Sequence, residues 1–410
     1  MFKRLFAISL LIAMSSAACA TTPQADPPPA TVVVAFDRES ITPLIVEGVR
    51  NKESGEPVEA NDPVRIASIS KLIMALATLR LVDEGKVDLD ADVSDYLGWP
   101  VRSPNFPDAK VTLAQLLSHR SGLRDNAGYV IPLGESLQAK LAEPDAWYAD
   151  APPGEAPFEY ANLGSPVVAT VLEAATDERF DAIMERTVFA PLGIEACLNW
   201  IGCSNEQVTR AITLYRDTGE IARDDPTDLP PNCTFPVAEG TECSLQNYVP
   251  GTNASIFSPQ GGVRIGMMDL AKIGQALLPG NRELLPQGIE KLTDQWLQEG
   301  KLSRELSLTE DASQQFFCFY FLGMQAIDYE GSWCEDGLFG DGLPRLGHAG
   351  EAYGLRAGLW FHPNRDQLGI AYFTTAVPPR QSAEDEGGFD PREIALMKRA
   401  QAILAEQSRD

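Results

Sequence analysis

The chain has 410 residues, 44% of them hydrophobic and 22% charged, which is the composition of a globular protein with a sizeable core. Its formal net charge of -25 argues against nucleic-acid binding, which needs clustered Lys and Arg, and against adsorption to anionic lipid. We interpret the acidity as a means of keeping an exported protein soluble.

Residues 1–20 have the pattern of a signal peptide. Lys3 and Arg4 precede an apolar run over residues 5–14, and small residues follow it. The run is too short for a membrane-spanning helix, which needs roughly 20 apolar residues. We therefore expect the mature protein outside the cytoplasm, in the periplasm.

Two cleavage sites fit this pattern. Ala18-Cys19-Ala20 is typical of ordinary cleavage before Thr21, whereas residues 16–19 resemble a bacterial lipobox in which Cys19 is lipidated. The Pro- and Thr-rich residues 21–31 would then form a tether. Both alternatives stay open, and membrane attachment is expected only through Cys19.

Six further cysteines remain, and their even number favours disulfides. We predict sequential pairs, because each closes a short loop in turn-rich sequence: Cys197 with Cys203, Cys233 with Cys243, and Cys318 with Cys334. Zinc is the alternative, but it needs close-spaced ligands, and the three histidines of the chain lie far apart. We expect neither a metal nor a cofactor.

Strand patterns lie at both ends of the chain, with helix patterns between them. In chain order, the predicted elements are strands over residues 32–36 and 44–49, helices over 68–82, 113–118, 165–175, 181–188, 268–278 and 287–298, strands over 355–361 and 368–374, and a helix over 391–405. Residues 197–251, dense in Pro, Asn, Asp and Gly, are expected to form loops. The simplest assembly is one antiparallel sheet of the terminal strands, with terminal helices on it and a helical subdomain beside it.

Ser68 and Lys71 stand three residues apart at the predicted start of the first helix. This spacing places them on one helical face, within contact distance. A serine hydroxyl becomes a good nucleophile when a neighbouring group takes its proton, and an amine one turn away can do so. The alternative is a capping serine beside a surface lysine. No other serine of the chain has a lysine three residues later.

Tyr160 and Asn162 form a second candidate pair. The phenol can act as a general base if a nearby lysine lowers its pKa, and the amide can hold a substrate amide or orient the lysine. The alternative is a loop tyrosine packed on the core.

The third candidate segment runs from Gly347 to Glu351, before the C-terminal strands. Its glycines allow the backbone to approach a ligand closely, and a strand edge there can donate a backbone N–H to an oxyanion. The alternative for His348 is a packed, hydrogen-bonded side chain.

The ordered motifs Ser-x-x-Lys, Tyr-x-Asn and His-x-Gly resemble those of the serine β-lactamase and penicillin-binding-protein family. The resemblance is greatest to class C β-lactamases and to related esterases, D-aminopeptidases and D,D-carboxypeptidases. Residues 116–123, 190–194 and 258–262 are also similar to segments of the family. The resemblance covers residues 32–405. It implies an α/β (α+β) fold with a five-stranded antiparallel sheet from both chain ends, about residues 32–67 and 344–405, beside a helical subdomain over about 68–343.

The resemblance also implies a role for each matching residue. Ser68 would attack an acyl carbonyl and form an acyl-enzyme, while Lys71 and Tyr160 share the proton transfers. Asn162 would bind the substrate.

The backbone N–H groups of Ser68 and Glu351, the residue after Gly350, would form the oxyanion hole. We expect the Glu351 side chain to face solvent. His119 is expected to have a structural role, because the family uses that turn to hold a helix end.

His348 stands where class C β-lactamases and most penicillin-binding proteins carry lysine. A lysine is a permanent cation for a substrate carboxylate, whereas a histidine near pH 7 is mostly neutral. We therefore expect a monomeric acyl-serine hydrolase acting on a small ester or amide. The alternatives are a peptidoglycan-directed D,D-carboxypeptidase or D-aminopeptidase, a β-lactamase, and a catalytically silent cell-envelope binding protein.

Overall fold

The computed structural model describes residues 29–216, 218–222, 235–278, 316–317, 319–328, 336–362, 369–378 and 388–407. The strands are β1 (Thr31–Phe36), β2 (Ile41–Glu47), β3 (Val64–Arg65), β4 (Ala196–Leu198), β5 (Val263–Ile265), β6 (Phe319–Phe321), β7 (Met324–Ile327), β8 (Arg345–Ala352), β9 (Leu355–Phe361) and β10 (Gly369–Thr374). The α-helices are α1 (Ile69–Asp83), α2 (Val93–Leu97), α3 (Leu113–Leu117), α4 (Leu137–Leu141), α5 (Gly164–Thr176), α6 (Phe180–Met184), α7 (Asn205–Arg210), α8 (Met267–Leu277) and α10 (Pro391–Gln407). Short 3-10 and π turns are η1 (Asp125–Ala127), η2 (Pro144–Ala146), η3 (Glu185–Phe189), η4 (Ala190–Leu192) and η5 (Ala254–Phe257).

Several sequence predictions lie outside the described residues. They are the signal peptide with Cys19, the helix over 287–298, and the cysteines Cys233, Cys318 and Cys334.

The large sheet has seven strands in the order β2-β1-β10-β9-β8-β7-β6, and every neighbouring pair is antiparallel. Its first five strands come from the two ends of the chain, as the sequence indicates. The predicted count of five is wrong, because β7 and β6 continue the sheet beyond β8. These two strands have only 3 or 4 residues each, too short for a periodic pattern to reveal them.

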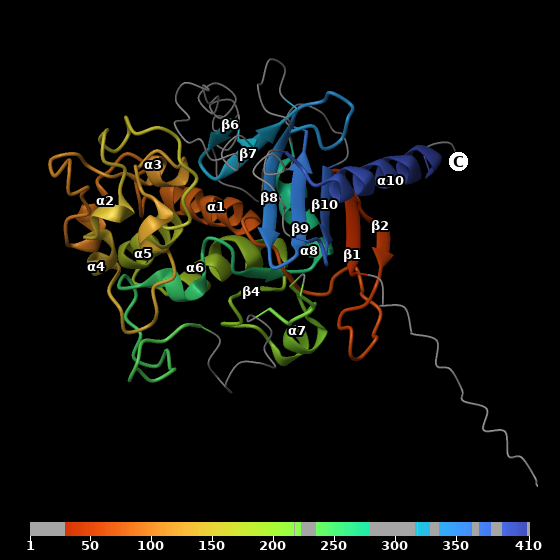
Figure 1. Ribbon diagram of the computed structural model, residues 1–410, viewed down its shortest axis with the longest axis horizontal. Helices are drawn as coiled ribbons and strands as arrows, with labels where there is room; N and C mark the ends of the chain where they lie inside the picture. The colour runs from red at the N-terminus through yellow and green to blue at the C-terminus, as the bar shows by residue number, and fades with distance from the viewer. Residues whose placement is uncertain are drawn as a thin grey trace, which may run out of the picture.

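Helices cover both faces of this sheet (Figure 1). α8 packs on the face that also meets the helical part, and α10 packs on the other, where Met397 lies against Val33 and Tyr372. Because both faces are covered, all six residues of β1 are buried, which explains its unbroken apolar sequence.

The central helix α1 joins the two parts of the molecule (Figure 1). It contacts β8 and β9 of the sheet as well as α5 and α6 of the helical part. Twelve of its 15 residues are buried, so it is apolar on every side, as expected for a helix surrounded by protein. The small sheet β3-β5-β4 leads into its N-terminus, because β3 ends three residues before Ser68.

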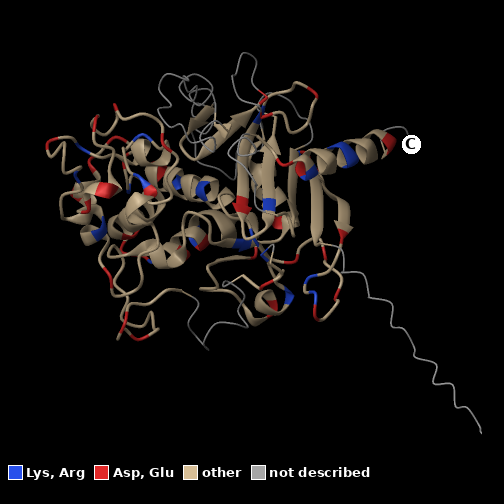
Figure 2. Ribbon diagram, viewed as in Figure 1, with Lys and Arg blue, Asp and Glu red and all other residues tan. Residues whose placement is uncertain are grey.

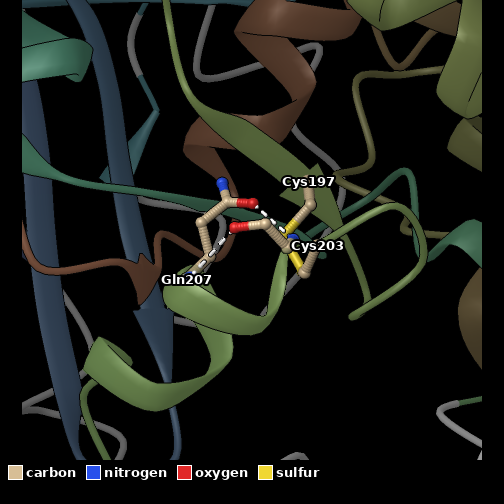
Figure 3. The surroundings of a disulfide bond; sticks show 4 residues. Cys197, Cys203 and Gln207 are labelled. Atoms are coloured by element: carbon tan, nitrogen blue, oxygen red, sulfur yellow. Dashed lines mark hydrogen bonds between the residues drawn. A yellow bond between two sulfur atoms is a disulfide. The ribbon is translucent and has the colours of Figure 1, made fainter.

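Residues 197–251 contain more regular structure than predicted. α7 begins directly after a disulfide between Cys197 and Cys203, whose Cα atoms lie 5.1 Å apart. Figure 3 shows this disulfide beside Gln207, which forms a capping box with Ser204. A Ser-x-x-Gln pattern is a sequence signature of a helix start, so this short helix has a local signal within the turn-rich segment. Cys243 is also disulfide-bonded.

The charged residues of the described part are dispersed. Figure 2 shows Asp and Glu spread over the helical part and the ends of the sheet. Among the residues that the structure describes, no helix has the length and apolarity needed to cross a bilayer, and no three His, Cys, Asp or Glu side chains are placed to hold a metal ion.

Candidate active site

Ser68 is placed at the N-cap of α1, where its side chain makes no capping hydrogen bond. The preceding Ala67 has a φ of +49°, a left-handed conformation that costs free energy for a residue with a Cβ and is common at functional sites. Ser68 itself is half-buried. Its hydroxyl is therefore presented by a tight turn and is not used to stabilise the helix.

Lys71 lies one turn further along α1 and is only 2% exposed. Its Nζ donates to Ser68 Oγ at 3.1 Å, to Asn162 Oδ1 at 2.8 Å and to the Gln260 carbonyl at 2.9 Å. Burial lowers the pKa of Lys71 to about 7, against an opposing effect of Asp125. The alternative of a capping serine beside a surface lysine is wrong, because the serine does not cap and the lysine is buried.

The Tyr160 hydroxyl lies within hydrogen-bonding range of Ser68. Burial raises its pKa well above the ordinary value, although the Ser68 contact acts in the opposite direction. The ring stacks on Phe317 with 4.7 Å between centroids, and Lys71 Nζ lies 4.7 Å from the centre of the Tyr160 ring. The net effect is a raised pKa, whereas a general-base role for this phenol needs a lowered one, so the Tyr160 hydroxyl is protonated at neutral pH.

His348 is buried on β8, 1% exposed, with both ring nitrogens engaged. Nδ1 lies 2.6 Å from the Ala349 carbonyl, which can only accept, so Nδ1 carries the proton. Nε2 then accepts from the Tyr320 hydroxyl at 3.0 Å. Burial, with a contribution from Lys71, lowers the pKa of His348 to about 3, so this ring is neutral.

Both ends of the Asn162 side-chain amide are hydrogen-bonded within the site, one of them to Lys71. Its Oδ1 accepts from Lys71 Nζ at 2.8 Å, and its Nδ2 donates to Asp125 Oδ2 at 2.9 Å. Of the two roles that the sequence suggested for this amide, the geometry favours orienting the lysine over binding a substrate amide.

Gly350 brings β8 against the segment that precedes the nucleophile. A Cβ at this position would lie 2.3 Å from the Ile66 carbonyl oxygen, so only glycine permits the approach. The next residue, Glu351, has a side chain that is 54% exposed and forms an ion pair with Arg356. The oxyanion hole formed by the N–H groups of Glu351 and Ser68 stays a prediction.

His119 contacts the segment that carries Tyr160. Its Nδ1 accepts from the Ala161 N–H at 3.2 Å, its carbonyl accepts from the Glu159 N–H at 3.1 Å, and its ring lies 4.4 Å from that of Tyr160. These contacts hold the Tyr160 segment in place.

Two residues of the site, Asp125 and Tyr320, were not among those that the sequence motifs indicate. Asp125 lies in η1, 37 residues before Asn162, and nothing in its neighbourhood marks it except that it follows the segment 116–123. Tyr320 belongs to the aromatic run over residues 316–321, which could have been noticed as material for an aromatic cluster.

The family model described as Beta-lactamase matches residues 29–390. The chain belongs to the β-lactamase family. Within it, the esterase EstB of Burkholderia gladioli is 32% identical over 229 residues, covering 52% of this chain and 55% of EstB.

Two further similarities extend the family comparison. The D-alanyl-D-alanine-carboxypeptidase/endopeptidase AmpH of Escherichia coli (strain K12) is 30% identical over 140 residues, covering 32% of this chain and 35% of AmpH. The chain thus spans about half the length of EstB and a third of AmpH. The class C β-lactamase of Rhodobacter sphaeroides superposes with a TM-score of 0.56 at 16% identity, over 93% of this chain and 95% of that one. The predicted fold class is confirmed.

Proposed function

We propose that this β-lactamase family member is a serine hydrolase that cleaves small esters or amides lacking a carboxylate, through an acyl-enzyme on Ser68. The observation that carries the proposal is the 3.1 Å contact of Ser68 Oγ with Lys71 Nζ, at a buried lysine whose pKa is lowered to about 7. At neutral pH a substantial fraction of such a lysine is an unprotonated amine, which can accept the proton of Ser68.

The reaction follows from these positions. Lys71 takes the Ser68 proton as Oγ bonds to the carbonyl carbon, and the carbonyl electron pair moves onto oxygen. As the tetrahedral intermediate collapses, the bond to the leaving group breaks and the leaving alcohol or amine takes a proton from the neutral phenol of Tyr160, which Lys71 reprotonates. In deacylation, Lys71 takes a proton from water as the water oxygen bonds to the acyl carbon. The bond from this carbon to Ser68 Oγ then breaks, Oγ takes a proton from Tyr160, and Lys71 returns a proton to the phenol as the acid leaves.

The preference against carboxylates rests on His348. A buried, neutral ring that already bonds to Ala349 and Tyr320 offers no cation to a substrate anion. Similarity to EstB supports the ester branch, and similarity to AmpH supports a D,D-peptidase as the second candidate.

The test is intact-protein mass spectrometry after exposure to a fluorophosphonate and, separately, to a penicillin, with Ser68→Ala as the control. We expect one fluorophosphonate adduct at Ser68, none on the variant, and no stable penicillin adduct. A stable penicillin adduct would instead place the protein in the peptidase branch. Absence of any adduct would favour the catalytically silent binding protein and contradict the proposal.

We also propose that the protein is exported to the periplasm. The basic and apolar pattern of residues 1–20 supports this, as does the Cys197–Cys203 disulfide, because disulfides persist mainly in oxidising compartments. The mass of the mature protein isolated from cell fractions tests the proposal. A chain beginning at Thr21 indicates ordinary cleavage, a lipidated Cys19 indicates a lipoprotein, and an uncleaved chain in the cytoplasm contradicts export.

A further inference from the structure

The Asp125 carboxylate accepts three hydrogen bonds, all from the segment that carries Asn162. Its Oδ2 accepts from the backbone N–H and from the side-chain Nδ2 of Asn162, each at 2.9 Å, and its Oδ1 accepts from the Leu163 N–H at 2.9 Å. One carboxylate in η1 therefore fixes both the backbone that leads into α5 and the orientation of the Asn162 amide.

The chemistry of a carboxylate determines which way this amide points. A carboxylate oxygen accepts hydrogen bonds, so the end of Asn162 that faces Asp125 has to be its NH₂ group. The amide oxygen is then directed to the opposite side, where it accepts from Lys71 Nζ at 2.8 Å. With the amide reversed, its NH₂ group would face the lysine, and Nζ would lose one of the acceptors that hold it beside Ser68.

We propose that Asp125 is a positioning residue of the reaction, which holds Asn162 and, through it, holds Lys71 in the orientation where Nζ reaches Ser68. This inference rests on the proposed function, since it assigns Asp125 to the same acylation step.

Besides its hydrogen bonds to Asn162, Asp125 affects Lys71 through its negative charge. The ionisable groups around this lysine come from separate elements: Tyr160 before α5, His119 after α3, His348 on β8, and Asp125 in η1. Burial lowers the pKa of both histidines and raises that of the phenol, so these three are neutral at pH 7. Asp125 raises the pKa of Lys71 against the effect of burial. Removing its charge lowers that pKa further, and Lys71 becomes a free amine at a lower pH.

The experiment measures the rate of fluorophosphonate labelling of Ser68 between pH 5 and 9 in the full-length protein, for wild type and Asp125→Asn. Labelling forms the Oγ–P bond, breaks the P–F bond and passes the Ser68 proton to Lys71, so it reports the base without requiring the natural substrate. We expect the plateau rate to fall roughly 10²-fold, the usual cost of a misplaced catalytic group, and the acid limb to move to lower pH.

Asp92→Asn is the matched control. Like Asp125, Asp92 accepts a hydrogen bond from a backbone N–H, that of Ser94 at 3.0 Å, but its side-chain partner is Arg102, outside the site. This variant should lose thermal stability and keep both the wild-type plateau and the wild-type acid limb. A purely structural Asp125 would behave in the same way, and an unshifted acid limb in Asp125→Asn overturns the inference.

Asp125→Glu keeps the test decisive if Asp125→Asn does not fold. It retains the charge but moves the carboxylate by one methylene, so we expect slower labelling with an acid limb near that of the wild type. Labelling at the wild-type rate overturns the positioning role. If the wild type itself is not labelled at Ser68, the proposed function fails and this inference fails with it.

Discussion

Lys71 on α1 and Glu173 on α5 are both buried, and burial moves both pKa values to about 7, from opposite directions. Glu173 accepts from the Phe180 N–H at 2.8 Å, the Tyr248 hydroxyl at 2.6 Å and the Gly251 N–H at 2.9 Å. Phe180 begins α6, whereas Tyr248 and Gly251 lie in the loop before η5, so Glu173 ties this loop to the helical part. It is fully enclosed, with no exposed surface.

Lys71 differs in what surrounds it. One of its three acceptors is the hydroxyl of Ser68, a half-buried residue that a substrate can reach. The shifted pKa is common to both groups, so the contact of Lys71 with a partly exposed nucleophile is what marks the reactive site. Burial alone also produces structural groups of this kind.

Replacing the two residues should separate these roles, and Lys71→Ala has the largest expected effect. Loss of the proton acceptor should slow acylation of Ser68 by roughly 10²–10⁴-fold, as is usual for a missing acid–base partner. The measurement is the rate of hydrolysis of a neutral p-nitrophenyl ester. Near-wild-type hydrolysis by the folded variant would mean that another group activates Ser68.

Glu173→Gln should change stability and leave hydrolysis per folded molecule unaltered. Glutamine would place an NH₂ group where one carboxylate oxygen of Glu173 now accepts a hydrogen bond, so at least one buried donor would lose its acceptor. A buried polar group without a partner costs about 1–3 kcal/mol. Urea unfolding gives the free energy, and ester hydrolysis gives the activity. A large loss of activity in the folded variant would show that Glu173 is not merely structural.

Glu173→Gln should also change how the free energy of unfolding depends on pH, by a smaller amount. The folded-state pKa of Glu173 is about 7, raised from 4.5, so the folded protein binds more protons than the unfolded chain between these values. The contribution of Glu173 to stability is therefore fully present below about pH 4.5 and is lost as the pH rises through about 7. Glu173→Gln should show a smaller decline in stability over this range. Identical pH dependence in both proteins would contradict the raised pKa.

The sequence predicted the parts of this molecule that depend on local spacing. Contact between Ser68 and Lys71 follows from their separation by one helical turn, and the strands at the two chain ends follow from apolar runs long enough to detect. The strands β6 and β7 escaped prediction because each is too short to show a period.

The parts that the sequence did not predict depend on distant contacts and on burial. Asp125 meets Asn162 across 37 residues of chain, and Tyr320 meets His348 across 28. The direction of each pKa shift depends on how completely the fold encloses the group. This is why the sequence could give only the condition for a general-base role of Tyr160, a lowered pKa, whereas burial in the fold raises that pKa.

The role of Lys71 as the base is tested by the pH dependence of acylation in the wild-type protein, measured as kcat/KM for a neutral ester between pH 5 and 9. If Lys71 is the base, it acts only as the free amine, so the rate should rise with pH through an acid limb near the lowered pKa of about 7 and then level off. A rate that is independent of pH over this range, or that rises only toward the ordinary lysine pKa, would contradict the central claim that burial makes Lys71 the base for Ser68.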